Sequence, residues 1–205
     1  MLSRKQFHSS EVALGRRPRL ARVLAASSAA SAMLLFGVAL AMPATADGRL
    51  FVSNYSDDTV TVYPRDVDGD VEPSAVFFTD DGPHQIAVWR TQGELFVANN
   101  LTYSVTVYDK GTGVLKRRIA GSNTQIDRPT GIAIDEVNAE LYVANDFGDS
   151  ITVYELTAEG NAAPKRTLAG SATGLVGPVG LAVDPAHNEL FVSNYRADDA
   201  GSITV

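Results

Sequence analysis

A short strand-like sequence, Leu-Phe/Tyr-Val-Ala/Ser-Asn, occurs four times along this 205-residue chain. The copies start at Leu50, Leu95, Leu141 and Leu190, which are 45, 46 and 49 residues apart. An Ile/Val-Thr-Val segment follows each copy, and in the first three copies a Tyr comes next. A regular spacing of about 40 to 50 residues is the sequence signature of a repeat protein in which similar units stack, such as a solenoid or a propeller.

Each repeat predicts four short β-strands. In the third copy these are Gly131–Asp135, Glu140–Asn145, Ser150–Tyr154 and Lys165–Gly170. They are rich in Val, Ile, Thr and Tyr with a period of two, and Gly, Asn, Asp and Pro lie between them. Four strands in about 45 residues are typical of one propeller blade.

The second strand of the repeat carries apolar side chains on both faces. We expect Leu141 and Val143 to face one way and Tyr142 and Ala144 the other. A sheet with one wet face would alternate apolar with charged residues, so this pattern favours a sheet packed between two neighbours.

The predicted fold class is therefore all-β, a β-propeller of four-stranded blades. The first blade lacks its innermost strand and the last stops inside its third, which gives 14 strands in an open arc of about three and a half blades. The expected blades are residues 47–79, 83–120, 129–170 and 178–205.

Two stretches resemble known repeat families. PTGIAIDEVNAELYVAND, residues 129–146, resembles the NHL-type repeat, and LFVSNYSDDTVTVY, residues 50–63, resembles the YVTN-type repeat. Both belong to exported β-propeller proteins of bacteria, and the resemblance covers residues 48–205. It implies the architecture but not the activity, because such propellers host binding, scaffolding and several unrelated enzymes.

Residues 1–46 are predicted to be a secretory signal-peptide helix rather than part of the fold. Basic residues precede an apolar stretch at 23–42, and Ala44-Thr45-Ala46 fits a signal-peptidase site. The chain is therefore expected to be exported to the periplasm or the extracellular space. An uncleaved membrane anchor is the alternative, and Arg16-Arg17 leaves open whether export uses the general or the twin-arginine route.

The charge balance excludes some classes of partner. Beyond residue 46 the chain holds 11 Lys/Arg against 23 Asp/Glu, a net charge of −12. Nucleic acid and anionic lipid both require a positive surface, so neither is expected as a partner, and no stable membrane insertion is expected after cleavage. The chain has no cysteine, so no disulfide stabilises it.

Four asparagines end the second strand of each repeat: Asn54, Asn99, Asn145 and Asn194. We expect them on one face of the arc, together with the loops that enter each first strand. We call this the upper face. The structural interpretation is that Asn suits a tight turn. The functional interpretation is a ring of amides near the channel that binds a ligand or a cation.

The loops after these asparagines vary while the strands repeat. Each loop carries an aromatic residue: Tyr55, Tyr103, Phe147 and Tyr195. Variable loops on a repeated scaffold often carry recognition. The pattern indicates binding of a protein, peptide or glycan, and a purely solvated set of loops is the alternative.

His84 and Gln85 break the repeat, because the next two blades have Thr130-Gly131 and Val179-Gly180 in their place. A histidine near the channel entry can bind a metal ion or transfer protons. The acidic run at 66–72 lacks the spacing of a helix-loop-helix calcium site and is interpreted as a turn. No cofactor is expected apart from a divalent cation in the alternative function given next.

The preferred hypothesis is an exported, non-enzymatic binding scaffold that acts through its upper-face loops. No known catalytic motif occurs and no catalytic residue is assigned. The alternative is a metal-dependent lactonase or gluconolactonase-like hydrolase with its site at the channel. We also expect the sequence to belong to a longer one, with Phe51, Phe191 and Val192 exposed on the end blades.

Overall fold

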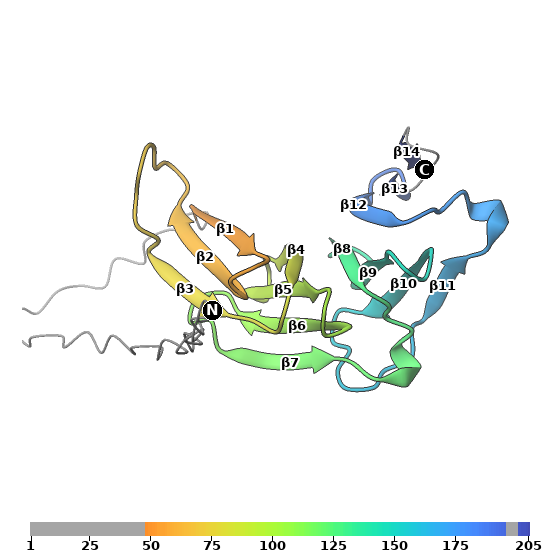
Figure 1. Ribbon diagram of the computed structural model, residues 1–205, viewed down its shortest axis with the longest axis horizontal. Helices are drawn as coiled ribbons and strands as arrows, with labels where there is room; N and C mark the ends of the chain where they lie inside the picture. The colour runs from red at the N-terminus through yellow and green to blue at the C-terminus, as the bar shows by residue number, and fades with distance from the viewer. Residues whose placement is uncertain (1–47, 196–200) are drawn as a thin grey trace, which may run out of the picture. The chain divides into compact units, whose positions relative to one another are not determined.

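The computed structural model describes residues 48–195 and 201–205, which form 14 strands and two 3-10 turns (Figure 1). The predicted signal-peptide helix lies outside the described residues. Within the described residues, no helix has the length and apolar character needed to cross a membrane. The strands are β1 (Arg49–Asn54), β2 (Thr59–Pro64), β3 (Ala75–Phe78), β4 (Pro83–Trp89), β5 (Glu94–Asn99), β6 (Ser104–Asp109), β7 (Leu115–Ile119), β8 (Pro129–Asp135), β9 (Glu140–Asn145), β10 (Ser150–Glu155), β11 (Arg166–Ala169), β12 (Pro178–Asp184), β13 (Glu189–Asn194) and β14 (Ser202–Thr204), and the turns are η1 (Ser122–Thr124) and η2 (Ser171–Thr173).

The strands form four antiparallel sheets, each a simple meander. The first sheet is β1-β2-β3, the second β4-β5-β6-β7, the third β8-β9-β10-β11 and the fourth β12-β13-β14. We call these sheets blades 1 to 4. They follow one another in chain order, and blades 1 and 4 lie at opposite ends of the arc (Figure 1). The predicted fold class, an open arc of 14 strands in blades of three, four, four and three, is confirmed.

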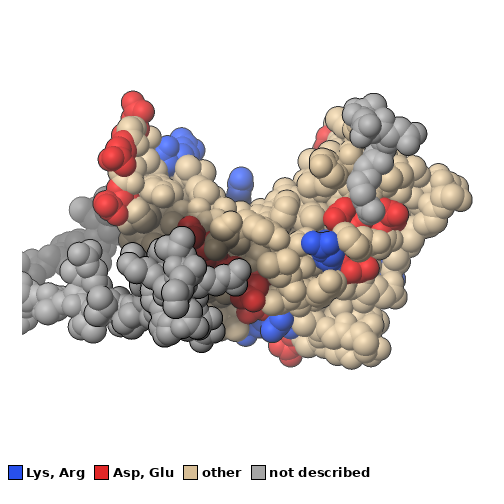
Figure 2. All heavy atoms as spheres, viewed as in Figure 1, with Lys and Arg blue, Asp and Glu red and all other residues tan. Residues whose placement is uncertain are grey.

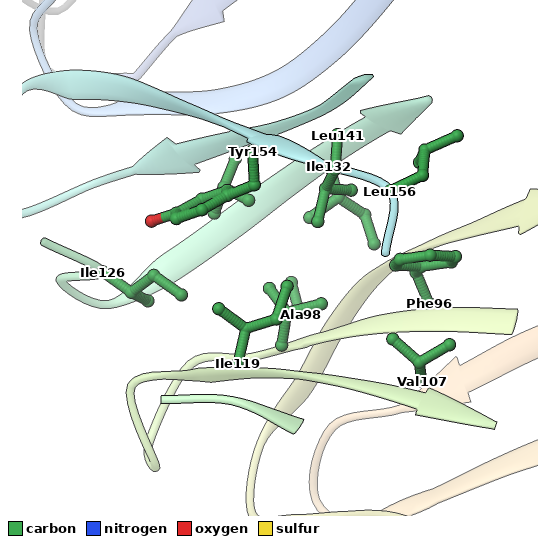
Figure 3. Close-up of a cluster of buried hydrophobic side chains, with 11 residues drawn as sticks. Phe96, Ala98, Val107, Ile119, Ile126, Ile132, Leu141, Tyr154 and Leu156 are labelled. Carbon is green, nitrogen blue, oxygen red and sulfur yellow. The ribbon is translucent and has the colours of Figure 1, made fainter. Parts of the chain in front are cut away.

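Apolar side chains between neighbouring blades hold the arc together. Between blades 2 and 3, Phe96 and Ile119 pack with Leu141, Val143 and Tyr154 (Figure 3). These five side chains are at most 1% exposed, as expected when a sheet is covered on both faces.

The two faces of β9 pack on different neighbours, as predicted. Leu141 and Val143 belong to the cluster shared with blade 2. Ala144 and Tyr142 pack instead in the cluster that includes Val192 of blade 4.

The expected exposure of Phe51 and Val192 is wrong. Val192 is only 2% exposed because it lies on the face of β13 that meets blade 3. Phe51 packs against the cluster between blades 1 and 2. Because strand side chains alternate, the exposed ones are their neighbours Leu50, at 51%, and Phe191, at 36%.

A β-bulge occurs near the start of each innermost strand. The pairing of β8 with β9 skips one residue between Pro129 and Gly131, and β12 skips one between Pro178 and Gly180. The register of β4 shifts between Pro83 and Ile86, a stretch that contains His84 and Gln85. Bulges re-aim side chains at the rim of a sheet, so His84 and Gln85 project differently from regular strand residues.

A buried carboxylate ties the second strand to the fourth in both complete blades. Glu94 accepts from Lys116 Nζ at 2.5 Å and from Arg117 Nη2 at 2.7 Å. In blade 3, Glu140 forms the matching ion pairs with Lys165 and Arg166. These contacts lie at the end of the blade opposite the asparagines.

Candidate functional site

The four asparagines share one hydrogen-bond pattern. Asn145 Nδ2 donates to Val143 O at 3.5 Å, to Ser150 Oγ at 3.3 Å and to Thr152 Oγ1 at 3.1 Å. The amides of Asn54, Asn99 and Asn194 donate to the equivalent carbonyl and two hydroxyls of their own blades. Each amide group therefore joins the second strand to the third.

The carbonyl oxygens of the asparagines differ between blades. Asn145 Oδ1 accepts from Asp127 N at 3.1 Å, and Asn194 Oδ1 accepts from Val176 N at 3.2 Å. Asn99 Oδ1 is buried and has no hydrogen-bond partner among the described residues. The segment that leads into β4 has only four residues, 79–82, whereas the segment that leads into β8 has nine. The shorter segment has no residue equivalent to Asp127, whose N–H group binds the carbonyl oxygen of Asn145. The assignment of these asparagines to a ligand site stays a prediction.

The four loop aromatics project from the same loop of each blade and are all solvent-exposed. Tyr55 is 44% exposed, Tyr103 47%, Phe147 56% and Tyr195 75%. Each follows the buried or half-buried end of a second strand, so the scaffold beneath it is fixed while the ring remains open to solvent.

Tyr55 belongs to an exposed apolar patch across the junction of blades 1 and 2. The Tyr55 ring meets the exposed His84 ring edge-on, with centroids 6.0 Å apart. Leu101, which is 50% exposed, lies beside it. A Cβ added at Gly82, whose φ is +70°, would come within 2.8 Å of Leu101 Cγ and 3.2 Å of Tyr55 Cε2. We call Tyr55, His84 and Leu101 the blade 1–2 patch.

Phe147 is paired with a cation. The Arg128 guanidinium lies over the Phe147 ring at 4.3 Å, within the range of a cation–π contact. Arg128 precedes Pro129 and has φ 49°, where the equivalent residues are Gly82 and Gly177. Six other non-glycine residues of the described part of the chain share this left-handed conformation, so the position of Arg128 beside Phe147 rather than its φ makes it a candidate.

Two loop carboxylates hold the upper-face loops to the following blade. Asp58 Oδ1 accepts from Gly82 N at 2.9 Å, and Asp149 Oδ1 accepts from Gly177 N at 2.7 Å. Both carboxylates have a structural role in these loops. The loops that carry Tyr55 and Phe147 are therefore held to the following blade.

The side chain of Gln85 contacts the next blade, whereas the side chain of His84 is exposed to solvent. Gln85 Oε1 accepts from Ile132 N at 3.1 Å and so links β4 to β8. His84 stays exposed and contacts Tyr55. The structure thus gives Gln85 a contact between blades and leaves the His84 side chain exposed, and the assignment of both residues to a ligand site stays a prediction.

In the described part of the chain, no group of three or more His, Cys, Asp or Glu side chains is arranged to hold a metal ion. The acidic run at 66–72 lies in the exposed loop between β2 and β3, where Figure 2 shows red side chains along the projecting loop. Gly69 there has φ +80°, as a turn requires.

Two solved structures with a similar fold identify the architecture of the chain. The chain is similar to hydrazine synthase from Kuenenia stuttgartiensis, with a TM-score of 0.58 and 23% identity over 72% of this chain and 39% of that one. The fold is that of a β-propeller. The WD40 β-propeller domain of Doa1 is also similar, with a TM-score of 0.56 and 14% identity over 78% of this chain and 47% of that one. The chain thus spans less than half the length of either.

No protein-family model and no curated protein matches this propeller. At the identities of its structural neighbours, the likeness establishes the fold alone. The activity of the propeller must therefore be argued from its own side chains.

Two residues of the upper face were missed by the sequence analysis. Arg128 could have been found as a break in the repeat, because glycine precedes the entry proline in blades 2 and 4. Leu101 could have been found because it is an apolar residue in a surface loop; it lies two residues after the asparagine, the position that Ser56 and Phe147 occupy in blades 1 and 3.

Proposed function

We propose that this chain is an exported, non-enzymatic propeller of the bacterial NHL/YVTN type that binds a protein, peptide or glycan through its upper face. One observation carries the proposal: all four blades present an exposed aromatic side chain from the same loop. Tyrosine and phenylalanine provide large contact areas at a low entropic cost, and they are enriched at binding surfaces.

The rigidity of these loops supports binding. Asp58 and Asp149 fix two of them to the next blade, so little conformational freedom is lost when a ligand contacts Tyr55 or Phe147. His84 and Arg128 add hydrogen-bond donors beside the rings. An aromatic ring with a polar donor beside it suits a sugar or a peptide side chain.

The test is a glycan and peptide array probed with the purified chain and with the double variant Tyr55→Ala/Phe147→Ala. We expect at least one ligand class to bind the native chain, and the variant to lose about tenfold or more in affinity with an unchanged melting temperature. The matched control is Val114→Ala/Val137→Ala, which truncates exposed side chains on turns at the opposite end of the blades. Equal loss in both variants would reject the assignment of the upper face.

The same preparation separates binding from hydrolysis. Lactone substrates are assayed with and without a chelator, in the native chain and in His84→Ala. Turnover that disappears with the chelator and with His84→Ala would support the metal-dependent hydrolase instead. Ligand binding without turnover would support the scaffold.

A further inference from the structure

The upper-face loops of blades 1 to 3 are strongly acidic. The loops that follow the second strands of these blades, together with the segments that lead into β4 and β8, carry seven aspartates and one arginine. The arginine is Arg128, and the aspartates are Asp57, Asp58, Asp80, Asp81, Asp127, Asp146 and Asp149. A surface with this balance attracts cations and repels anions. The exposed aromatic rings stand in the same loops, and such rings also hold cations over their faces.

The chain itself places a cation on one of these rings. At the entry to blade 3, the Arg128 guanidinium lies 4.3 Å from the centroid of the Phe147 ring. In the sequence, Asp127 directly precedes this arginine and Asp146 directly precedes this phenylalanine. An arginine over an aromatic ring, in loops rich in aspartate, is therefore already part of the upper face.

The junction of blades 1 and 2 has an exposed ring but no such cation. Gly82 stands at the position that Arg128 occupies at the entry to blade 3, so the entry segment provides no side chain there. Tyr55 and Leu101 lie against this glycine and are both exposed. The blade 1–2 patch therefore offers a surface on which a planar guanidinium from another molecule can stack.

Two carboxylates beside this patch have no partner. Asp58 Oδ1 accepts from a backbone N–H group, and Asp80 forms an ion pair with Arg118 at 3.2 Å. Asp57 and Asp81 are exposed, and neither forms an ion pair or a side-chain hydrogen bond within the part of the chain that the structure describes. They lie on the two segments that border the patch, so a cation bound there would be close to both segments.

A buried oxygen beneath the same junction adds to its negative potential. The Asn99 amide group makes the same contacts as those of Asn145 and Asn194, whose Oδ1 atoms accept from the segments that lead into β8 and β12. Asn99 Oδ1 therefore faces the segment 79–82, where it is buried and has no partner among the described residues. Without a donor, the partial negative charge of this oxygen is uncompensated in a medium of low dielectric constant. The junction accordingly favours a positively charged ligand.

We propose that the blade 1–2 patch binds an arginine side chain from an extended, basic segment of a partner protein, a ligand class that rests on the binding role proposed above. The guanidinium stacks on the exposed Tyr55 ring, the alkyl stem contacts Leu101, and Asp57 and Asp81 face the charge. Arginine suits this arrangement because its guanidinium is planar, weakly hydrated and able to bond to carboxylates while it stacks. A neutral glycan would gain nothing from the two unpaired carboxylates.

The probe is a labelled octapeptide of alternating arginine and serine, titrated against the full chain by fluorescence anisotropy. We expect saturable binding that weakens as the salt concentration rises, because ions screen exposed charges. A peptide with citrulline in place of each arginine keeps the planar end of the side chain and loses the charge. This peptide should bind at least about tenfold more weakly.

Variants of the chain locate the site. Asp57→Asn/Asp81→Asn removes two charges beside the patch and should weaken binding about fivefold. The matched control, Asp68→Asn/Asp70→Asn, removes two charges from the exposed loop between β2 and β3, at the opposite end of blade 1. It should change the affinity by less than about twofold, because charges beyond the screening length contribute little. Melting temperatures confirm that both variants fold.

Equal binding of the citrulline peptide would overturn the proposal, since contact with the patch would then not require charge. Equal affinities of the two double variants would also overturn it, because the peptide would then respond only to the net charge of the chain. A neutral or acidic array ligand that loses affinity in Tyr55→Ala and is not displaced by the arginine peptide would contradict the arginine site and leave the proposed binding role intact. No array ligand and no peptide binding would reject both.

Discussion

Val143 lies at the centre of the interface between blades 2 and 3, with a side chain that is 0% exposed. We expect Val143→Asp to unfold the propeller, because a buried charge without a partner costs several kcal/mol, comparable to the whole stability of a domain. Circular dichroism during urea unfolding measures this.

Asp68→Asn is the matched surface change, in the exposed turn between β2 and β3. It should shift the free energy of unfolding by about 0.5 kcal/mol or less. Similar effects of Asp68→Asn and Val143→Asp would show that the faces of β9 are wrongly assigned.

Asn145 and Asn54 test whether the asparagines hold the strands together. Asn145→Ala leaves Asp127 N–H and the buried Ser150 hydroxyl without this partner, whereas Thr152 keeps its contact with the Tyr154 hydroxyl, so we expect a loss of about 2 to 3 kcal/mol in the free energy of unfolding. Asn54 is partly exposed and should cost less when changed to Ala. Denaturant melts of the two variants compare them, and equal losses would contradict the role assigned to burial.

Among single residues, only part of the candidate site was predictable from the sequence. The aromatics and asparagines were found because they recur in every repeat. The contact of Gln85 with Ile132 and the contacts of the loop acids with glycine N–H groups were not, because they cross between blades. A repeat predicts each unit well but leaves the fine register between units open.

At the scale of the element, the Glu140 side chain of β9 reaches across β10 to form an ion pair with Arg166 of β11. Hydrogen bonds from Arg166 lower the pKa of Glu140 from 4.5 to about 2, and they outweigh the opposing effect of desolvation. A lowered carboxyl pKa contributes stability that is complete above about pH 4.5 and is lost as the pH falls toward 2.

Glu140→Gln should therefore lower the melting temperature at neutral pH and reduce its decline between about pH 4.5 and pH 2. Differential scanning calorimetry across this range measures both effects. Glu189→Gln is the control, since this exposed residue at the equivalent position forms no ion pair within the described residues. An unchanged pH profile in Glu140→Gln would contradict the assignment.

The strands themselves were predictable, because Leu141, Val143 and their repeats alternate with a clear period of two. Their number and grouping follow from that pattern. The ion pairs of Glu94 and Glu140 were not foreseen. Long Lys and Arg side chains on the fourth strand can reach several partners, and the pairing of β6 with β7 shifts register between Val107 and Tyr108 of β6.

At the scale of the whole molecule, the free face of blade 1 is apolar. Leu50, Val52, Val76 and Phe78 are between 37% and 80% exposed. An exposed apolar patch on a sheet promotes association. We expect self-association that increases with concentration, and Phe78→Lys should reduce it. Analytical ultracentrifugation measures this, with Val114→Lys as the control, and a monomer at all concentrations would contradict the expectation.

The three interfaces between blades differ in size: 11 buried apolar side chains lie in the middle cluster, against six in each outer one. In a stacked-repeat protein each unit is stabilised mainly by its neighbours. Amide hydrogens of β5, β6, β8 and β9 should therefore exchange with deuterium most slowly, and those of β1, β3 and β14 most rapidly. Mass spectrometry of exchanged peptides would show the chain opening from its two outer blades inward, with the Phe96–Tyr154 layer as the last part to exchange.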